Sequence, residues 1–134
     1  MRFDDFYFKK FKFSQDQINQ NIENASKDLA IAKKDAILDV KFNYAYTAFI
    51  KVGIALLSSH HVKIKSVPGH HVKIIEKMAE ILKDENILST GNAMRSKRNM
   101  DFYGGGIEVT EKECKGYIRF VDEVFTKVKN TLVF

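Results

Sequence analysis

Apolar side chains recur along most of the chain at the spacing of an α-helix. After residue 14 they follow one another at intervals of three and four residues, with asparagine, glutamate and lysine between them. At about 100° per residue, such positions fall on one face of a helix. Ser14 with Gln17, and Thr110 with Glu113, have the sequence of a capping box. We therefore expect one helix to begin after Ser14 and the last helix to begin after Thr110.

A second segment, from Leu38 to Leu56, repeats this spacing but lacks a polar face. Tyr44, Tyr46 and several aliphatic residues occupy most of the remaining surface. A helix that is apolar on most sides is surrounded by other helices, so we expect this one at the centre of the fold.

The segments are separated by few helix-breaking residues. Pro68, the only proline, suits the first turn of a third helix. A link over 84–90 is expected to lead into a fourth helix at about 90–103, and the three glycines 104–106 to stop it. Strand-like alternation is confined to residues 1–13 and a short stretch at 62–64. The pattern predicts an all-α fold, an antiparallel four- to five-helix bundle.

The first thirteen residues form an arm that is rich in aromatic side chains. We expect the arm to pack on its own bundle, because aromatic rings bury on the order of 150–250 Å² each. Contact with a partner or a second subunit is one alternative, and stacking on nucleic acid is another. The six aromatic residues of the arm are Phe3, Phe6, Tyr7, Phe8, Phe11 and Phe13.

Length and composition narrow the class of protein. A chain of 134 residues has the size of one domain, so we expect a single domain over 1–134. No run of eighteen apolar residues is present, which excludes a membrane-spanning helix. The single cysteine, Cys114, excludes an internal disulfide and fits a cytoplasmic protein. The net charge of +5 permits a polyanionic partner.

The four histidines are candidate metal ligands because they form two pairs, at 60–61 and 70–71. Adjacent residues on a helix point about 100° apart, however, and no acidic residue lies between the pairs. We therefore predict no metal site and no cofactor, with the histidines exposed to solvent or capping a helix start.

The segment 94–103 has the densest polarity in the chain. Arg95, Lys97 and Arg98 lie within four positions, and Arg95 and Arg98 share one helical face. Two guanidinium groups on one face can hold a phosphate through paired hydrogen bonds. The alternative is a solvated face whose arginines pair with acids.

Three features together resemble the HEPN superfamily, small prokaryotic helical-bundle domains often encoded beside a minimal nucleotidyltransferase. The central helix carries alternating aromatic and small residues at 42–49, and a Gly-His pair opens the following helix at 69–70. An Arg-Asn pair at 98–99 is followed by Asp101 and Tyr103. The resemblance covers roughly residues 14–132.

The resemblance implies a dimer in which two such motifs face each other. Active members are metal-independent ribonucleases, with an arginine, a polar residue after it and a histidine four to six residues on. Arg98 and Asn99 match the first two positions. Tyr103, or Asp101 when the spacing is read from Arg95, stands where the histidine would be. Unperturbed pKa values of about 10 and 4 make tyrosine and aspartate poor bases at neutral pH.

The sequence thus favours a HEPN-like homodimer that binds nucleotide or RNA through Arg95, Arg98 and Asn99. It would act with a nucleotidyltransferase partner in a toxin–antitoxin-type or defence system, without efficient catalysis. The alternative is a ribonuclease toxin whose catalytic residues are Arg98 with Asp101 or Tyr103. A helical interaction protein of another kind is the third reading, so the sequence leaves open whether the protein is an enzyme.

Overall fold

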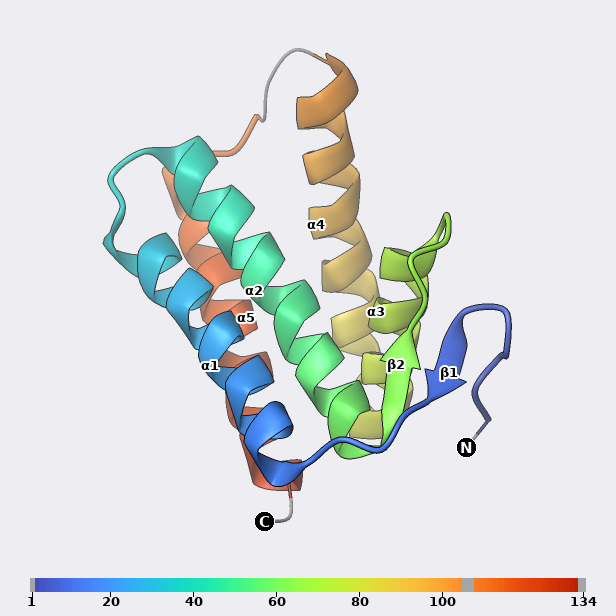
Figure 1. Ribbon diagram of the computed structural model, residues 1–134. Coiled ribbons are helices and arrows are strands. Elements are labelled where there is room, and N and C mark those ends of the chain that lie inside the picture. Colours follow the sequence, from blue (N-terminus) through green and yellow to red (C-terminus); the bar gives the residue numbers. More distant parts are fainter. Residues whose placement is uncertain (1, 105–107, 133–134) are drawn as a thin grey trace.

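The chain folds into five helices and a small two-stranded sheet (Figure 1). A computed structural model describes residues 2–104 and 108–132, apart from the side chains of 101–104. In chain order the elements are β1 (Phe8–Lys10), α1 (Gln15–Lys34), α2 (Leu38–Ser59), β2 (Val62–Ile64), α3 (His70–Leu82), α4 (Glu85–Gly104) and α5 (Glu111–Thr131).

Helix α2 lies at the centre of the fold, as its missing polar face predicts. It packs against α1, α3, α4, α5 and β2 (Figure 1). Most of its side chains are buried, including the large aromatic residues Phe42, Tyr46 and Phe49. The helices pack as a bundle around α2, with α1 and α5 on one side of it and α3 and α4 on the other.

Both predicted capping boxes are confirmed. At the start of α1 the backbone N–H of Gln17 donates to Ser14 Oγ over 3.2 Å, and the N–H of Ser14 donates to Gln17 Oε1 over 2.9 Å. Thr110 and Glu113 make the equivalent pair of bonds at the start of α5. Each box satisfies two backbone donors that would otherwise lack partners at a helix start.

Helix α4 begins at Glu85, so the prediction of a link over 84–90 is wrong. Only Lys83 and Asp84 separate α3 from α4. The Asp84 carboxylate accepts a hydrogen bond from the backbone N–H of Asn86 over 3.0 Å. Ile87 in the first turn is completely buried, and this burial holds a polar stretch in the helix. The helix ends at Gly104, in agreement with the predicted stop.

Gly91 lies inside α4, at the point where this helix packs against α2. The helix continues through it without interruption. A Cβ atom at Gly91 would lie 2.7 Å from Cζ of Phe49 on α2. The missing side chain lets α4 approach α2 closely, and Gly53 on α2 has the same role opposite Ile74 of α3. The sequence pattern alone does not distinguish such a packing glycine from a helix breaker.

The two-stranded sheet corrects the prediction of an all-α fold. Strands β1 and β2 pair antiparallel, with Phe8 opposite Ile64 and Lys10 opposite Val62. Phe8 and Val62 are buried, so the pairing covers one end of the core. The strand-like alternation at the two segments was visible in the sequence, but their pairing was not.

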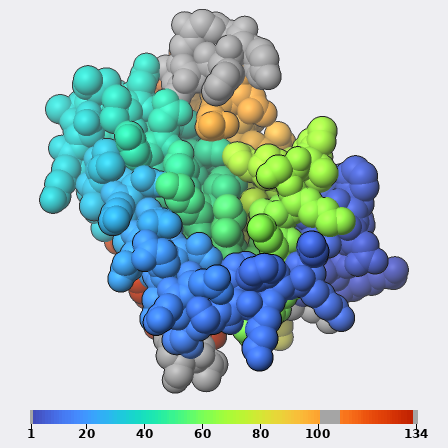
Figure 2. All heavy atoms as spheres, in the orientation of Figure 1, coloured from blue at the N-terminus to red at the C-terminus, as the bar shows by residue number. Residues whose placement is uncertain are grey.

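The aromatic arm packs on the bundle only in part. Phe8 is buried, and Phe3, Tyr7 and Phe13 are packed against the core. Phe6 and Phe11 remain 60% and 40% exposed. Figure 2 shows the N-terminal residues (blue) on the outside of the molecule, beside the green segment that follows α2. Within the described residues, no helix is long and apolar enough to cross a membrane.

Gly91→Ala should destabilise the fold, because its methyl group would overlap the Phe49 ring. Overpacking of this kind costs about 1–3 kcal/mol, and we expect the melting temperature to fall by several degrees. Gly116→Ala on α5 is the matched control, since no atom lies within 4 Å of a Cβ there. That change should stabilise the chain by about 0.5–1 kcal/mol through helix propensity. Equal melting temperatures for the two variants would contradict the packing role of Gly91.

Candidate functional site

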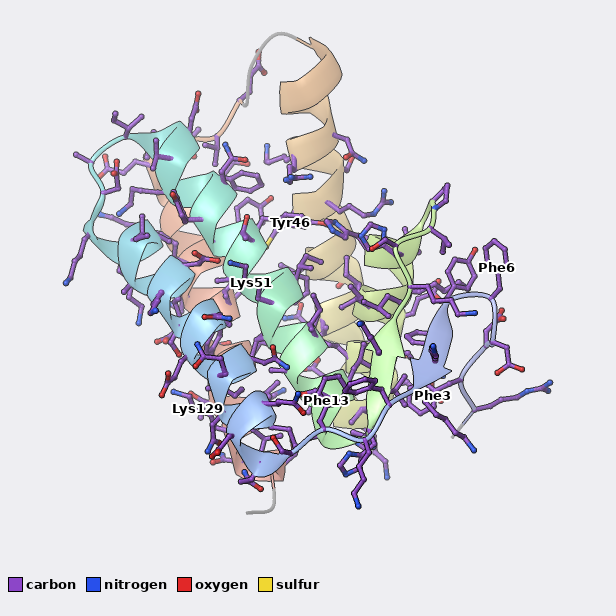
Figure 3. All side chains as sticks on the ribbon, in the orientation of Figure 1. Phe3, Phe6, Phe13, Tyr46, Lys51 and Lys129 are labelled. Carbon is purple, nitrogen blue, oxygen red and sulfur yellow. The ribbon has the colours of Figure 1, made fainter. Side chains whose placement is uncertain are left out.

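A hollow of about 500 Å³ lies where the turn before α3 meets the second half of α4. Residues 66–72 form one wall, and Arg95, Arg98 and Asn99 form the other. Tyr46 of α2 lies beside both walls, because it bonds to α3 and its ring lies against Arg98. Figure 3 shows Tyr46 on the side of α2 that faces α4.

The turn at 67–69 sets the position of two histidines. Gly69 has φ of 82°, a left-handed conformation that side chains disfavour, and it ends the turn directly before α3. His70 donates from its backbone N–H to Val67 O over 3.1 Å, and its ring Nδ1 lies 2.9 Å from the same oxygen. Since a carbonyl only accepts, Nδ1 of His70 carries a proton. Pro68 lies in this turn and not in the first turn of α3, which corrects its predicted place.

Tyr46 and His71 form a hydrogen-bonded pair at the inner end of the hollow. Tyr46 Oη lies 3.0 Å from Nδ1 of His71, and the centres of the two rings are 5.8 Å apart. Tyr46 is only 1% exposed, so its hydroxyl needs a partner inside the protein. His71 is half-buried in the first turn of α3, whereas the sequence predicts histidines that are exposed to solvent or cap a helix start.

Both members of this pair are uncharged at neutral pH. Burial raises the pKa of Tyr46 to about 12, although the charges of Arg98 and Arg95 act in the opposite direction. Burial also lowers the pKa of His71 to about 4, and the neighbouring His70, Arg98 and Arg95 add to this effect. We assign the proton of this hydrogen bond to the Tyr46 hydroxyl. If Nδ1 of His71 donated instead, the hydroxyl proton would need another acceptor, and the neighbouring arginines cannot accept one. His71 then accepts at Nδ1 and carries its own proton on Nε2.

Two guanidinium groups supply the charge of the site. Arg98 Cζ lies 5.4 Å from the centre of the Tyr46 ring, within the range of a cation–π contact. Nε of Arg95 is buried and has no hydrogen-bond acceptor among the described groups. A buried donor without an acceptor costs about 1–3 kcal/mol. Arg95 and Arg98 therefore bring positive charge to the hollow, and the buried Nε of Arg95 has a hydrogen-bonding capacity that no described group satisfies.

The structure brings together the three residues predicted to bind an anion. Arg95, Arg98 and Asn99 all line the hollow. Lys97 of the same segment points elsewhere, since its ammonium donates to the backbone oxygen of Glu108 over 2.8 Å and lies 3.5 Å from Glu113. Lys97 thus contacts Glu108, which the sequence offered as an acidic partner of the arginines, through the backbone oxygen of that residue.

The predicted catalytic side chains Asp101 and Tyr103 lie outside the described side chains, although their backbone belongs to α4. Tyr46 and His71 are the site residues that sequence reasoning missed. The signal for Tyr46 was a hydroxyl on a helix without a polar face, which implies a buried polar group that needs a partner.

The histidine pairs do not come together as a metal centre. His60 and His61 line a different hollow from His70 and His71. Over the described residues, no three histidine, cysteine, aspartate or glutamate side chains gather in a way that could hold an ion. Cys114 is buried on α5, where burial raises the pKa of its thiol.

Comparisons with protein families, with curated proteins and with solved structures find no match to this chain. The chemistry of the site must therefore be inferred from its own residues.

We expect His71 to remain uncharged as the pH falls below 6.5. The folded chain protonates this ring only near pH 4, whereas the unfolded chain binds the proton near pH 6.5. The unfolded state thus binds more protons between these values, and the stability that His71 contributes is lost as the pH drops through this window. The ¹⁵N shifts of the ring at pH 5.5 should show a neutral imidazole protonated on Nε2. Titration of His71 near pH 6.5 would contradict this account.

Proposed function

We propose that the hollow binds a phosphate group of a nucleotide or of RNA. The observation that carries the proposal is made at Arg95: this residue lines the hollow, and its buried Nε is a charged donor that lacks an acceptor among the described groups. A phosphate has oxygen acceptors in a geometry that suits guanidinium groups. Asn99, which is exposed at the rim, adds an amide that can donate to the same ligand.

The electrostatics of the hollow support an anion over a cation or a neutral ligand. The charges of Arg95 and Arg98 both act on Tyr46 and His71, and these two rings are uncharged at neutral pH. The rings therefore supply no negative charge to balance the arginines. Of the two, His71 lines the hollow, and its hydrogen bond to Tyr46 holds its ring in place.

The resemblance to the HEPN superfamily gives this site a biological setting. The arginine–asparagine pair lies at the hollow, and the helix opened by residues 69–70 lies opposite it. We propose a homodimeric HEPN-like module that acts with a nucleotidyltransferase partner in a toxin–antitoxin-type or defence system. A phosphate site made of arginines fits such a role, because it binds nucleotide or RNA without needing to cleave it.

Removal of either guanidinium group should weaken binding. Arg95→Ala and Arg98→Ala should each raise the Kd for a short single-stranded RNA about tenfold, because a charge-assisted hydrogen bond is worth about 1.5–3 kcal/mol. Arg119→Ala is the matched control, since Arg119 is exposed on α5 and lies outside the hollow. Fluorescence anisotropy measures the binding, and thermal melting checks the fold. If the arginines are structural instead, the melting temperature should fall by several degrees, and binding should fall only as far as the folded fraction of the protein falls.

A metal-independent ribonuclease is the second candidate function. It is favoured by His71, a neutral imidazole that comes from a different helix and lies near the charges of Arg98 and Arg95. The catalytic set would be Arg98 with this histidine, or with Asp101 or Tyr103 as the sequence suggests. A histidine with a pKa of about 4 is a weak base, and a tyrosine with a pKa of about 12 is a weak acid.

We therefore expect the wild-type protein to cleave RNA barely above background in the presence of EDTA. The reason is that neither Tyr46 nor His71 has a pKa near neutrality, where general acid–base catalysis is efficient. Gel analysis of a labelled RNA measures cleavage, with Arg98→Ala as the comparison. Strong cleavage that disappears in Arg98→Ala would establish the ribonuclease and contradict the non-catalytic proposal.

A further inference from the structure

The β1–β2 sheet carries a group of lysines without acidic partners. No carboxylate in the described part of the chain lies within ion-pair distance of Lys9, Lys10, Lys12 or Lys63. Lys9 is directly opposite Lys63 in the sheet, and such like-charged pairs are destabilising. Seven lysines elsewhere do pair with carboxylates: Lys33, Lys51, Lys73, Lys77, Lys97, Lys115 and Lys127.

The outer edge of β1 has backbone groups that can pair with another strand. The N–H of Phe11 donates to His61 O over 3.0 Å, and the N–H of Lys65 donates to Tyr7 O over 2.7 Å. Residues 7 and 11 thus bond toward β2, and the alternation of an antiparallel pair turns the N–H and C=O of Lys10 outward. The N–H of Phe8 is already bonded to Asp4 O, so the open part of the edge begins at Lys10.

A groove of about 700 Å³ lies at this sheet, lined by Arg2, Phe3 and Asp5, by residues 8–12 and by residues 60–62. The N-terminal segment runs alongside β1 and forms its outer wall (Figure 1). Figure 3 shows Phe3 and Phe6 on this segment, at the side of the sheet away from α2. The rings of Phe3 and Phe8 meet edge to face, with centres 5.3 Å apart, and give the groove an apolar lining.

The aromatic rings next to the groove argue for a peptide over a nucleic acid. Binding of single-stranded nucleic acid uses exposed ring faces on which bases stack. Here lysine ammonium groups lie over three of the rings, at 5.5 Å from the centre of Phe11, 5.0 Å from Tyr7 and 4.9 Å from Phe3. A base would have to displace these cations, whereas a peptide strand would not.

The lysines also select which strand can be added. A second copy of this edge would bring its own lysines against Lys9 and Lys10, and such charge protects edge strands from pairing with themselves. An acidic strand meets mainly opposite charge, because the groove is lined by Arg2, Lys9, Lys10 and Lys12 against the single carboxylate of Asp5. Because side chains alternate along a strand, one face of an added strand would meet Phe3 and Phe8 while its other face would meet Lys9.

We propose that the groove binds an extended acidic segment of another protein, which adds to the sheet as a strand beside β1. In this mode backbone hydrogen bonds to Lys10 supply affinity, and alternating side chains supply specificity. The preferred sequence alternates acidic and apolar residues, with carboxylates toward Lys9. This site is separate from the phosphate-binding hollow and does not depend on it.

A labelled ten-residue peptide of alternating glutamate and valine tests the proposal by fluorescence anisotropy. It should bind at least tenfold more tightly than the glutamine–valine peptide of the same length. The variant Lys9→Glu/Lys10→Glu should weaken binding at least tenfold, and it should fold because a glutamate at position 9 would face Lys63. The matched control is Lys27→Glu/Lys34→Glu on α1, which changes the net charge equally and should bind as the wild type does.

N-methylation of the peptide tests the strand geometry. Only one set of alternate N–H groups would face β1, so methylation of one set should abolish binding and methylation of the other should not. Arg95→Ala should leave peptide binding unchanged, which separates this site from the phosphate site. Equal binding of the glutamine peptide, or equal effects of the two methylation sets, would overturn the proposal. Tighter binding of a ten-nucleotide uridine RNA, abolished in the Lys9→Glu/Lys10→Glu variant, would overturn the proposal in favour of a nucleic-acid ligand.

Discussion

The burial of α2 is the constraint on which the rest of the structure depends. A helix with apolar residues on most of its surface must be covered on every side, and α1, α3, α4, α5 and β2 provide that cover. Close contact is achieved where a side chain is missing, where Gly53 of α2 meets α3 and where Gly91 of α4 meets α2. These contacts hold the start of α3 and the middle of α4 on the same side of α2.

The candidate site follows from this arrangement because α2 carries one large polar side chain into the interior. The hydroxyl of Tyr46 needs a partner, and His71 supplies it at 3.0 Å. Arg98 covers the ring of Tyr46, and Arg95 places a buried Nε donor beside the same hollow. Two cations beside two neutral rings form a site whose positive charge suits an anion. The β1–β2 sheet shows a related imbalance, because its lysines Lys9, Lys10 and Lys63 have no carboxylate of the described residues within ion-pair distance.

Much of the fold could be predicted from the sequence, because periodicity and capping are local properties. Both capping boxes, the central helix and the shared face of Arg95 and Arg98 are of this kind. The start of α4 was missed because its opening stretch is mostly polar and is held in the helix by the burial of Ile87, a tertiary contact that no local pattern specifies. The pair of Tyr46 and His71 was missed because it joins residues from different helices, and no local pattern specifies which helices meet.

The most direct test of the anion site observes the Nε–H group of Arg95 by NMR while inorganic phosphate, and then adenosine monophosphate, is added. The account predicts that this Nε–H signal moves downfield and becomes protected from exchange with water, because a phosphate oxygen becomes its acceptor. The Nε2–H signal of His71 should shift with the same binding constant, while the signal of Arg119 on α5 stays fixed. An Arg95 signal that remains unchanged at saturating ligand would contradict the account.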